Sequence, residues 1–153
     1  MIKFFETETK LSEEEICRAE KEIGFVLPEV YKQHLMKHNG GRCNPRNFSF
    51  IEDGKRSNSG IEWFFAIYDG EYDNFVRFFF IYKIDSKRLP TPVFPFASDS
   101  FGNLICMDSS DEKIYFWDHE DEVDYTIHDD SVRTNLFWIA DSLEEFLNNL
   151  KED

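Results

Sequence analysis

Two consecutive helices are predicted near the start of the chain from the spacing of its apolar residues. Residues 12–15 read Ser-Glu-Glu-Glu, a capping box in which the Ser hydroxyl and the last Glu carboxylate each accept from the other residue's amide. The apolar residues of 16–23 then share one stripe, and Gly24 is placed to end the helix. Pro28 suits the first turn of a second helix, which the Asn-Gly-Gly of residues 39–41 should end.

The middle of the chain predicts two strands and a helix. Residues 44–60 are rich in Asn, Ser, Gly and Arg apart from residues 48–51, so we expect a loop, a short strand and a loop. Residues 61–68 have the aromatic and β-branched content of a strand. Residues 74–85 are almost continuously apolar, and periodicity alone leaves them open between buried strand and buried helix. We predict a helix, because the length, an Asp-Asn cap and a proline after a polar tail favour it.

The second half of the chain predicts an antiparallel meander closed by a helix. Strands are expected at residues 93–97, 103–107, 114–117 and 136–140. In the third of these the side chains alternate, so both of its faces must meet apolar partners. A second capping box at residues 142–145 opens a terminal helix that should pack on the sheet.

The chain shows no internal repeat and no linker, so we expect a single α+β domain over residues 1–153. Its central sheet should be mainly antiparallel, with two N-terminal helices, a middle helix and a C-terminal helix packed on it. With 41% hydrophobic residues, including 17 Phe, 3 Trp and 6 Tyr, the chain can bury an aromatic core, which excludes intrinsic disorder.

The charge of the chain narrows its classes of partner. There are 17 Lys and Arg against 31 Asp and Glu, which gives a net charge of −14. Such a field repels nucleic-acid phosphates and anionic lipid, so direct binding to nucleic acid or a membrane is not expected. It favours a basic protein partner or cations, although a uniformly solvated acidic surface accounts for the same composition.

The three cysteines help to predict the cellular compartment of the protein. Cys17, Cys43 and Cys106 are odd in number and widely spaced, which argues against a disulfide framework and for reduced thiols. The first ten residues lack the pattern of a signal peptide, and no stretch approaches the roughly 20 apolar residues of a membrane-spanning helix. We therefore expect a cytoplasmic protein.

The sequence gives only weak signals for metal ligands and for catalytic nucleophiles. His34 and His38 stand one helical turn apart, with Cys43 nearby, but the Glu of the HExxH pattern is absent. Packing by His34 and helix-end capping by His38 explain these residues without a metal. Cys106 lies inside an apolar strand without a cationic neighbour. We therefore predict no metal, no cofactor and no enzymatic activity.

The densest acidic run is residues 118–124, where five of the seven side chains are Asp or Glu. A solvated sheet edge, a cation site or a partner surface would each explain the run. A partner contact gains from the neighbouring Tyr115 and Trp117, because an aromatic anchor inside a charged rim is typical of interfaces.

Several segments, in order along nearly the whole chain, resemble the SUKH superfamily of Smi/Knr-like domains. They are residues 12–16, 22–31, 38–41, 95–103, 113–120 and 139–147. The resemblance implies an α+β fold without catalytic machinery. It also implies the role of the bacterial members, which mostly bind and neutralise a cognate toxin, often a nuclease, made by the same cell. Fungal relatives instead regulate cell-wall synthesis, and the short single-domain architecture here resembles the bacterial type.

Two hypotheses follow. In the first, the chain is an immunity protein that covers the active cleft of a basic toxin, with the acidic surface in the place of a nucleic acid. The residues expected at that contact are Trp63, Glu71, Tyr72, Asp73, Trp117, Asp118, Glu120 and Asp121. In the second, the chain is a non-enzymatic interaction module whose aromatic sheet holds a peptide, as in the fungal branch. The sequence does not decide whether the chain dimerises.

Overall fold

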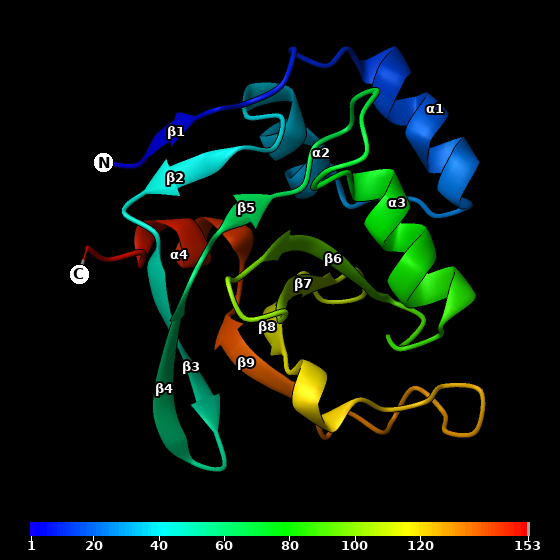
Figure 1. Cartoon of the computed structure of the whole chain (residues 1–153), viewed down its shortest axis with the longest axis vertical. Helices are drawn as coiled ribbons and strands as arrows, with labels where there is room; N and C mark the ends of the chain where they lie inside the picture. The colour runs from blue at the N-terminus through cyan, green and yellow to red at the C-terminus, as the bar shows by residue number, and fades with distance from the viewer. Residues whose placement is uncertain (153) are drawn as a thin grey trace.

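A five-stranded antiparallel sheet lies at the centre of residues 1–152, the part of the chain that the computed structural model describes (Figure 1). The α-helices are α1 (Glu13–Ile23), α2 (Glu29–Lys37), α3 (Phe75–Phe79) and α4 (Leu143–Asn148), with a π-helix, η1 (Phe80–Asp85), directly after α3 and a 3-10 helix, η2 (His119–Asp121). The strands are β1 (Lys3–Phe5), β2 (Arg42–Asn44), β3 (Asn47–Glu52), β4 (Lys55–Gly60), β5 (Trp63–Phe64), β6 (Val93–Ser98), β7 (Leu104–Asp108), β8 (Ile114–Trp117) and β9 (Leu136–Ala140).

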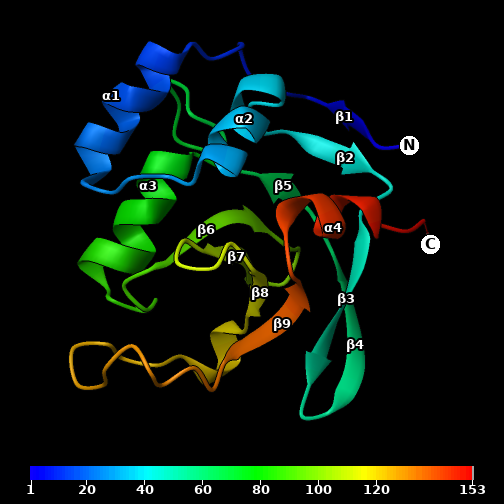
Figure 2. The ribbon, with the colours of Figure 1, turned by 180° about the vertical axis from the view of Figure 1, so that it is seen from behind.

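The topology confirms the predicted α+β class. The central sheet has the order β5-β6-β7-β8-β9 and every neighbouring pair is antiparallel, as expected of a meander. Two further pairs, β1 with β2 and β3 with β4, form separate two-stranded sheets. In Figure 1, α3 lies to the right of β6 and β7 and α4 lies to their left, and Figure 2 shows the two helices with these sides exchanged, so helices flank the sheet on both sides.

The predicted start and end of the first helix are confirmed. The Ser12 hydroxyl accepts from the Glu15 amide at 3.2 Å, and the Glu15 carboxylate accepts from the Ser12 amide at 3.0 Å. Gly24 ends α1 in the left-handed conformation at φ 66°. At α4 only half of the predicted box forms, because the Glu145 carboxylate accepts from the Asp141 amide at 3.1 Å instead of from Ser142.

The segment 74–85 is helical, as predicted. The Asn74 side chain caps it by accepting from the Arg77 amide at 3.1 Å. The first turn is α-helical, and the chain widens into a π-helix from Phe80. Phe75 and Phe79 are buried on one side, and Phe75 packs edge-on against Phe94 of β6 at 6.1 Å between ring centroids.

For residues 44–60 the predicted short strand at 48–51 lies within β3, but the loop predicted after it is wrong, because residues 55–60 form β4 and complete the long β3–β4 hairpin. Asp53 and Gly54 connect the strands with φ of 51° and 77°, the left-handed pair that a two-residue hairpin turn requires. β4 carries no apolar side chain, so it gives no alternating pattern, and it is held by its pairing with β3.

The predicted strand at residues 61–68 is shortened to β5. Beyond β5 the backbone leaves the sheet, because the Ile67 amide donates to the side chain of Asn39 at 2.9 Å. The buried Asn39 side chain also donates to the carbonyls of Ile67 and Thr9. A polar side chain from the end of α2 thus replaces the expected strand partner.

Strand β8 has the two covered faces that its alternation predicts. Phe116 stacks on Phe50 of the hairpin, with centroids 4.1 Å apart and planes 11° apart. Trp117 points the other way and meets Tyr82 of η1 edge-on at 5.4 Å. The sheet is therefore enclosed between the hairpin on one side and η1 on the other.

Candidate partner-binding surface

The structure places Trp117 in the core, which corrects its expected position on an interaction surface. Its side chain is 0% exposed, and its indole nitrogen donates to the Arg88 carbonyl at 3.2 Å. Alternation along a strand shows that two faces exist, but it does not show that η1 covers the second one. A partner cannot reach this ring in the folded chain.

Glu71, Tyr72 and Asp73 lie together in the loop between β5 and α3. The Asn74 side chain holds this loop by donating to the carbonyls of Tyr68 and Gly70. Tyr72 is 75% exposed, and burial together with the charge of Glu62 raises the pKa of Asp73. Glu71 lines a shallow hollow of about 790 Å³ between this loop and α1, which also contains Arg18 and Arg77.

Trp63 lies neither in the core with Trp117 nor in the loop of residues 71–73. It is half-buried in β5, where the Arg42 guanidinium lies 5.4 Å from the ring centroid and pairs with Glu62 at 3.6 Å. Its ring therefore already has a cationic neighbour within the chain.

A second group of the predicted residues lies in an acidic hollow between the hairpin turn and η2. The acidic hollow has a volume of about 530 Å³ and is lined by Glu52, Asp53, Glu120, Asp121, Glu122, Thr134 and Phe137. Five of these seven residues carry a carboxylate. They come from two segments almost seventy residues apart in the sequence.

Local hydrogen bonds explain why η2 presents its carboxylates to this side. The Asp118 side chain caps η2 by accepting from the Glu120 amide at 2.9 Å. Asp118 is further fixed through its backbone, because its amide donates to the Asn135 carbonyl at 3.0 Å. The predicted contact residue Asp118 thus positions Glu120 and Asp121 and does not itself line the acidic hollow.

Few of the carboxylates in the acidic hollow are neutralised by salt bridges to cationic side chains of the described chain. Glu122 pairs with Arg88 at 3.2 Å, whereas Glu52, Asp53, Glu120 and Asp121 make no salt bridge within residues 1–152. Unpaired carboxylates that share a concave surface create a negative potential that attracts cationic groups. No cluster of His, Cys, Asp and Glu among the described residues is arranged to hold a metal ion. The arrangement suits a partner that brings several basic side chains.

Sequence reasoning missed Glu52 and Asp53. The signal was present as the Asp53-Gly54 dipeptide, a strong indicator of a two-residue hairpin turn. It was not used because the polar β4 hid the second strand. Nothing in the sequence pattern indicates that this turn meets η2, since that contact depends on how the hairpin packs.

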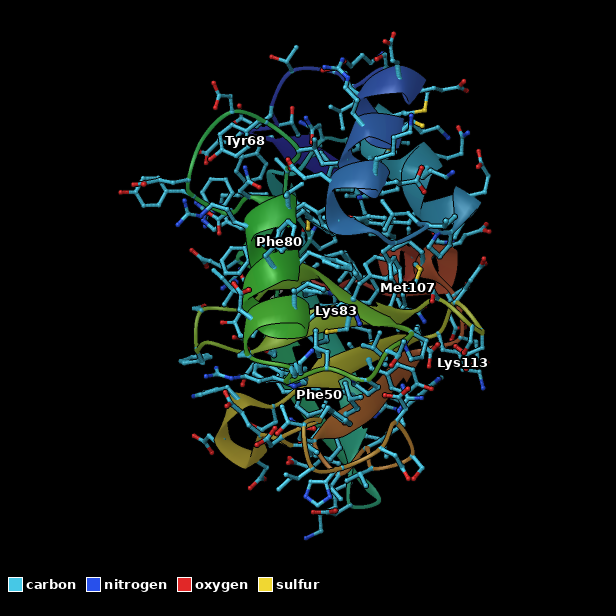
Figure 3. All side chains as sticks on the ribbon, turned by 90° about the vertical axis from the view of Figure 1, so that its right-hand side faces the viewer. Phe50, Tyr68, Phe80, Lys83, Met107 and Lys113 are labelled. Atoms are coloured by element: carbon cyan, nitrogen blue, oxygen red, sulfur yellow. The ribbon has the colours of Figure 1, made fainter. Side chains whose placement is uncertain are left out.

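The two groups of predicted residues lie at opposite ends of the molecule. The loop of Glu71, Tyr72 and Asp73 is at the top of Figure 1, and the hairpin turn and η2 are at the bottom. Figure 3 shows the same separation, with Tyr68 above α3 and Phe50 of the hairpin below it. The structure therefore divides the predicted contact into two surfaces.

The histidine pair packs against the N-terminal strand. His34 is buried, and its burial, with smaller effects of His38 and Lys37, lowers its pKa to about 4. The ring of Phe4 in β1 stacks on His38 at 3.8 Å. Burial raises the pKa of Cys43 to about 11, so the nearby thiol is a poor thiolate ligand at neutral pH.

The remaining thiol of the interior, Cys106, is fully buried in β7, and burial raises its pKa. Such a thiol acts as a small apolar side chain.

None of the helices in residues 1–152 has the length and apolar content needed to cross a membrane.

Comparison with known proteins identifies the family. The model of the SMI1 / KNR4 family (SUKH-1) matches residues 10–149, which include the four α-helices, the whole central sheet and the hairpin. The chain belongs to the SMI1/KNR4 family (SUKH-1). Among its relatives, the SPbeta prophage-derived uncharacterized protein YokK of Bacillus subtilis (strain 168) is 29% identical over 155 residues, which cover 92% of this chain and 74% of YokK. This family is the one that the sequence segments resemble. Its members typically bind protein partners.

Proposed function

We propose that this SUKH-1 chain is an immunity protein that binds a basic toxin domain and occludes its active cleft. The observation that carries the proposal is the acidic hollow, where five carboxylates from the hairpin turn and the η2 segment share one surface and, within the described chain, only Glu122 makes a salt bridge. Family membership supports the proposal, because SUKH proteins often serve in immunity.

The proposed toxin is a nuclease. A nuclease must hold phosphates with Lys and Arg side chains, so its active cleft is basic. Carboxylates of the acidic hollow would occupy the positions of the phosphates and exclude the nucleic acid. The net charge of −14 adds a long-range attraction that raises the rate of encounter with a basic partner.

The proposed contact uses the end of the molecule that carries Glu120 and Asp121. Asp118 acts through the position of η2. We assign Trp63, Glu71, Tyr72 and Asp73 to a separate surface that is not part of this contact, because the loop of residues 71–73 lies at the opposite end of the chain (Figure 1).

We place the protein in the cytoplasm of the cell that makes the toxin, where it protects that cell. The free thiols of Cys17, Cys43 and Cys106 fit a reducing compartment. The partner is a protein, and the action needs no cofactor.

The alternative of an aromatic sheet that holds a peptide finds most of the sheet's rings covered, and Trp138 of β9 is the strand aromatic of the central sheet that is exposed. Phe116 is covered by the hairpin and Trp117 by η1, and Phe94 and Phe96 of β6 are fully buried. A peptide would have to displace the hairpin or η1 to reach Phe116 or Trp117.

Co-expression tests the proposal directly. The partner to test is the carboxyl-terminal domain of any large secreted protein that is encoded beside this gene. We expect co-expression to restore growth to cells that produce this domain, and we expect a one-to-one complex of the two purified proteins in size-exclusion chromatography. Continued toxicity without a detectable complex would contradict the proposed function.

A further inference from the structure

Phe101 is an exposed aromatic residue on the turn between β6 and β7. Its side chain is 74% exposed, whereas most of the phenylalanines on the sheet strands are buried. A lone exposed apolar residue is common on protein surfaces and by itself indicates nothing. The construction of this turn and its position give Phe101 a more specific meaning.

A buried carboxylate holds the turn in one conformation through hydrogen bonds. Asp99 is 5% exposed and accepts four hydrogen bonds at 2.9 Å, from the amides of Phe101 and Asn103, the Asn103 side chain and the Ser59 hydroxyl of β4. Gly102 takes φ of 87°, which closes the turn. The backbone on both sides of Phe101 is thus fixed before any partner arrives, so binding would order little additional chain.

The turn also contacts the element that carries the acidic hollow. The Asn103 side chain accepts from the His119 amide at 3.1 Å, and a side-chain carbon added at Gly102 would lie 3.6 Å from the His119 ring. His119 is the first residue of η2, which continues into Glu120 and Asp121. The turn and η2 are therefore packed neighbours, and the Phe101 side chain itself lines an adjoining hollow of about 460 Å³ at the base of the hairpin, beside Arg46 and Lys151.

We propose that Phe101 is the apolar anchor of the toxin interface and inserts into an apolar pocket of the toxin domain, next to the Lys and Arg side chains that meet the acidic hollow. This inference rests on the proposed function and names the residue of the chain that contributes most to affinity. Interface hot spots are typically rigid aromatic side chains near the centre of a contact, with polar groups around them that exclude water.

Tyr72 provides a matched control within the same chain. It is 75% exposed and projects from a loop that the Asn74 side chain holds, as Phe101 projects from a turn that Asp99 holds, but this loop lies at the opposite end of the molecule. Phe101→Ala and Tyr72→Ala thus remove equally exposed rings that differ in their distance from the acidic hollow.

The test measures the affinity of purified wild-type protein and both variants for an inactivated form of the neighbouring toxin domain, by isothermal titration calorimetry. We expect Phe101→Ala to raise Kd about thirtyfold, as for a hot-spot residue, and Tyr72→Ala to leave Kd within about twofold, as for a residue outside the interface. Equal effects of the two changes, with wild-type binding intact, would overturn the inference and leave the proposed function standing. Absence of wild-type binding would overturn both.

A second measurement does not depend on variant stability. A photo-crosslinking phenylalanine analogue at position 101 should form a covalent adduct with the toxin domain, and the same analogue at position 72 should not. A crosslink between two copies of this chain through position 101, in place of a crosslink to the toxin, would identify a homodimer contact and overturn the inference.

Discussion

The ring of Phe50 in the hairpin lies flat on the ring of Phe116 in β8, with centroids 4.1 Å apart. This stack joins two parts of the chain that are more than sixty residues apart, and both rings are buried. It seats β3 and β4 against the central sheet and so brings Glu52 and Asp53 to the same hollow as Glu120 and Asp121. The acidic hollow therefore depends on an aromatic contact in the core.

Replacement of Phe50 by Ala should destabilise the protein by about 3–4 kcal/mol, because it removes a buried ring and leaves a cavity beside Phe116. The free energy of unfolding in urea measures the loss. Ile51→Ala is the control, since the neighbouring Ile51 is 36% exposed and its removal should cost about 1 kcal/mol or less. Equal losses at the two positions would show that the stack does not hold the hairpin.

Substitutions at two glycines distinguish the stability cost of backbone strain from the cost of close packing. Gly24 and Gly40 have similar left-handed φ values of 66° and 71°. A side-chain carbon at Gly24 would meet nothing within 4 Å, whereas one at Gly40 would lie 2.4 Å from the Cβ of Ala66. Gly24→Ala should cost about 1 kcal/mol from strain alone. Gly40→Ala should cost about 2 kcal/mol more from overpacking, as measured by urea unfolding; similar values would contradict the close approach of residues 40 and 66.

The buried His34 should make the protein less stable in acid. Burial, with smaller effects of His38 and Lys37, lowers the pKa of His34 from 6.5 to about 4 in the folded state. Between these pH values the unfolded chain binds the proton and the folded chain does not, so stability is complete above pH 6.5 and falls as the pH decreases toward 4. The loss from this group amounts to about 3 kcal/mol.

The variant His34→Phe isolates this effect, since it keeps a ring beside Phe4 and Phe64 and removes the titrating group. We expect the free energy of unfolding of the wild type to fall more steeply than that of the variant between pH 6.5 and pH 4. Parallel pH profiles for the two proteins would show that His34 does not lose its proton on folding.

Local signals in the sequence were sufficient for the helices. The capping box at Ser12, the glycine after α1 and the cap at Asn74 all act within a few residues of the element they define. The helix at residues 74–85 was predicted on length and capping, although its apolar residues run without a period. Its π-helical second half has no sequence signal that we identify.

Elements whose partners are distant in the sequence were predicted less well. β4 is a strand because it pairs with β3, and the strand predicted at residues 61–68 ends early because Asn39 binds its backbone. The same limit applies to the candidate site. The acidic run at residues 118–124 was visible, but its union with Glu52 and Asp53, and the burial of Trp117 under η1, arise only from tertiary packing.

In the proposed function, the acidic hollow steers the protein onto a basic toxin domain. The most direct measurement is the association rate constant for the neighbouring toxin domain, by stopped flow at low and physiological ionic strength. The test variant combines Glu120→Lys with Asp121→Lys. The control combines Glu8→Lys with Glu13→Lys. Both positions are exposed and lie at the end of the molecule opposite the acidic hollow, Glu8 in the segment that leads into α1 and Glu13 at the first residue of α1, and both variants change the net charge equally.

We expect the reversal at Glu120 and Asp121 to slow association at low salt by about tenfold or more, and the control to slow it by no more than about twofold. The wild-type rate should fall steeply as salt is added, because exposed charges are screened within a Debye length of about 8–10 Å. Equal slowing by the two variants, or a wild-type rate that salt does not change, would contradict the account.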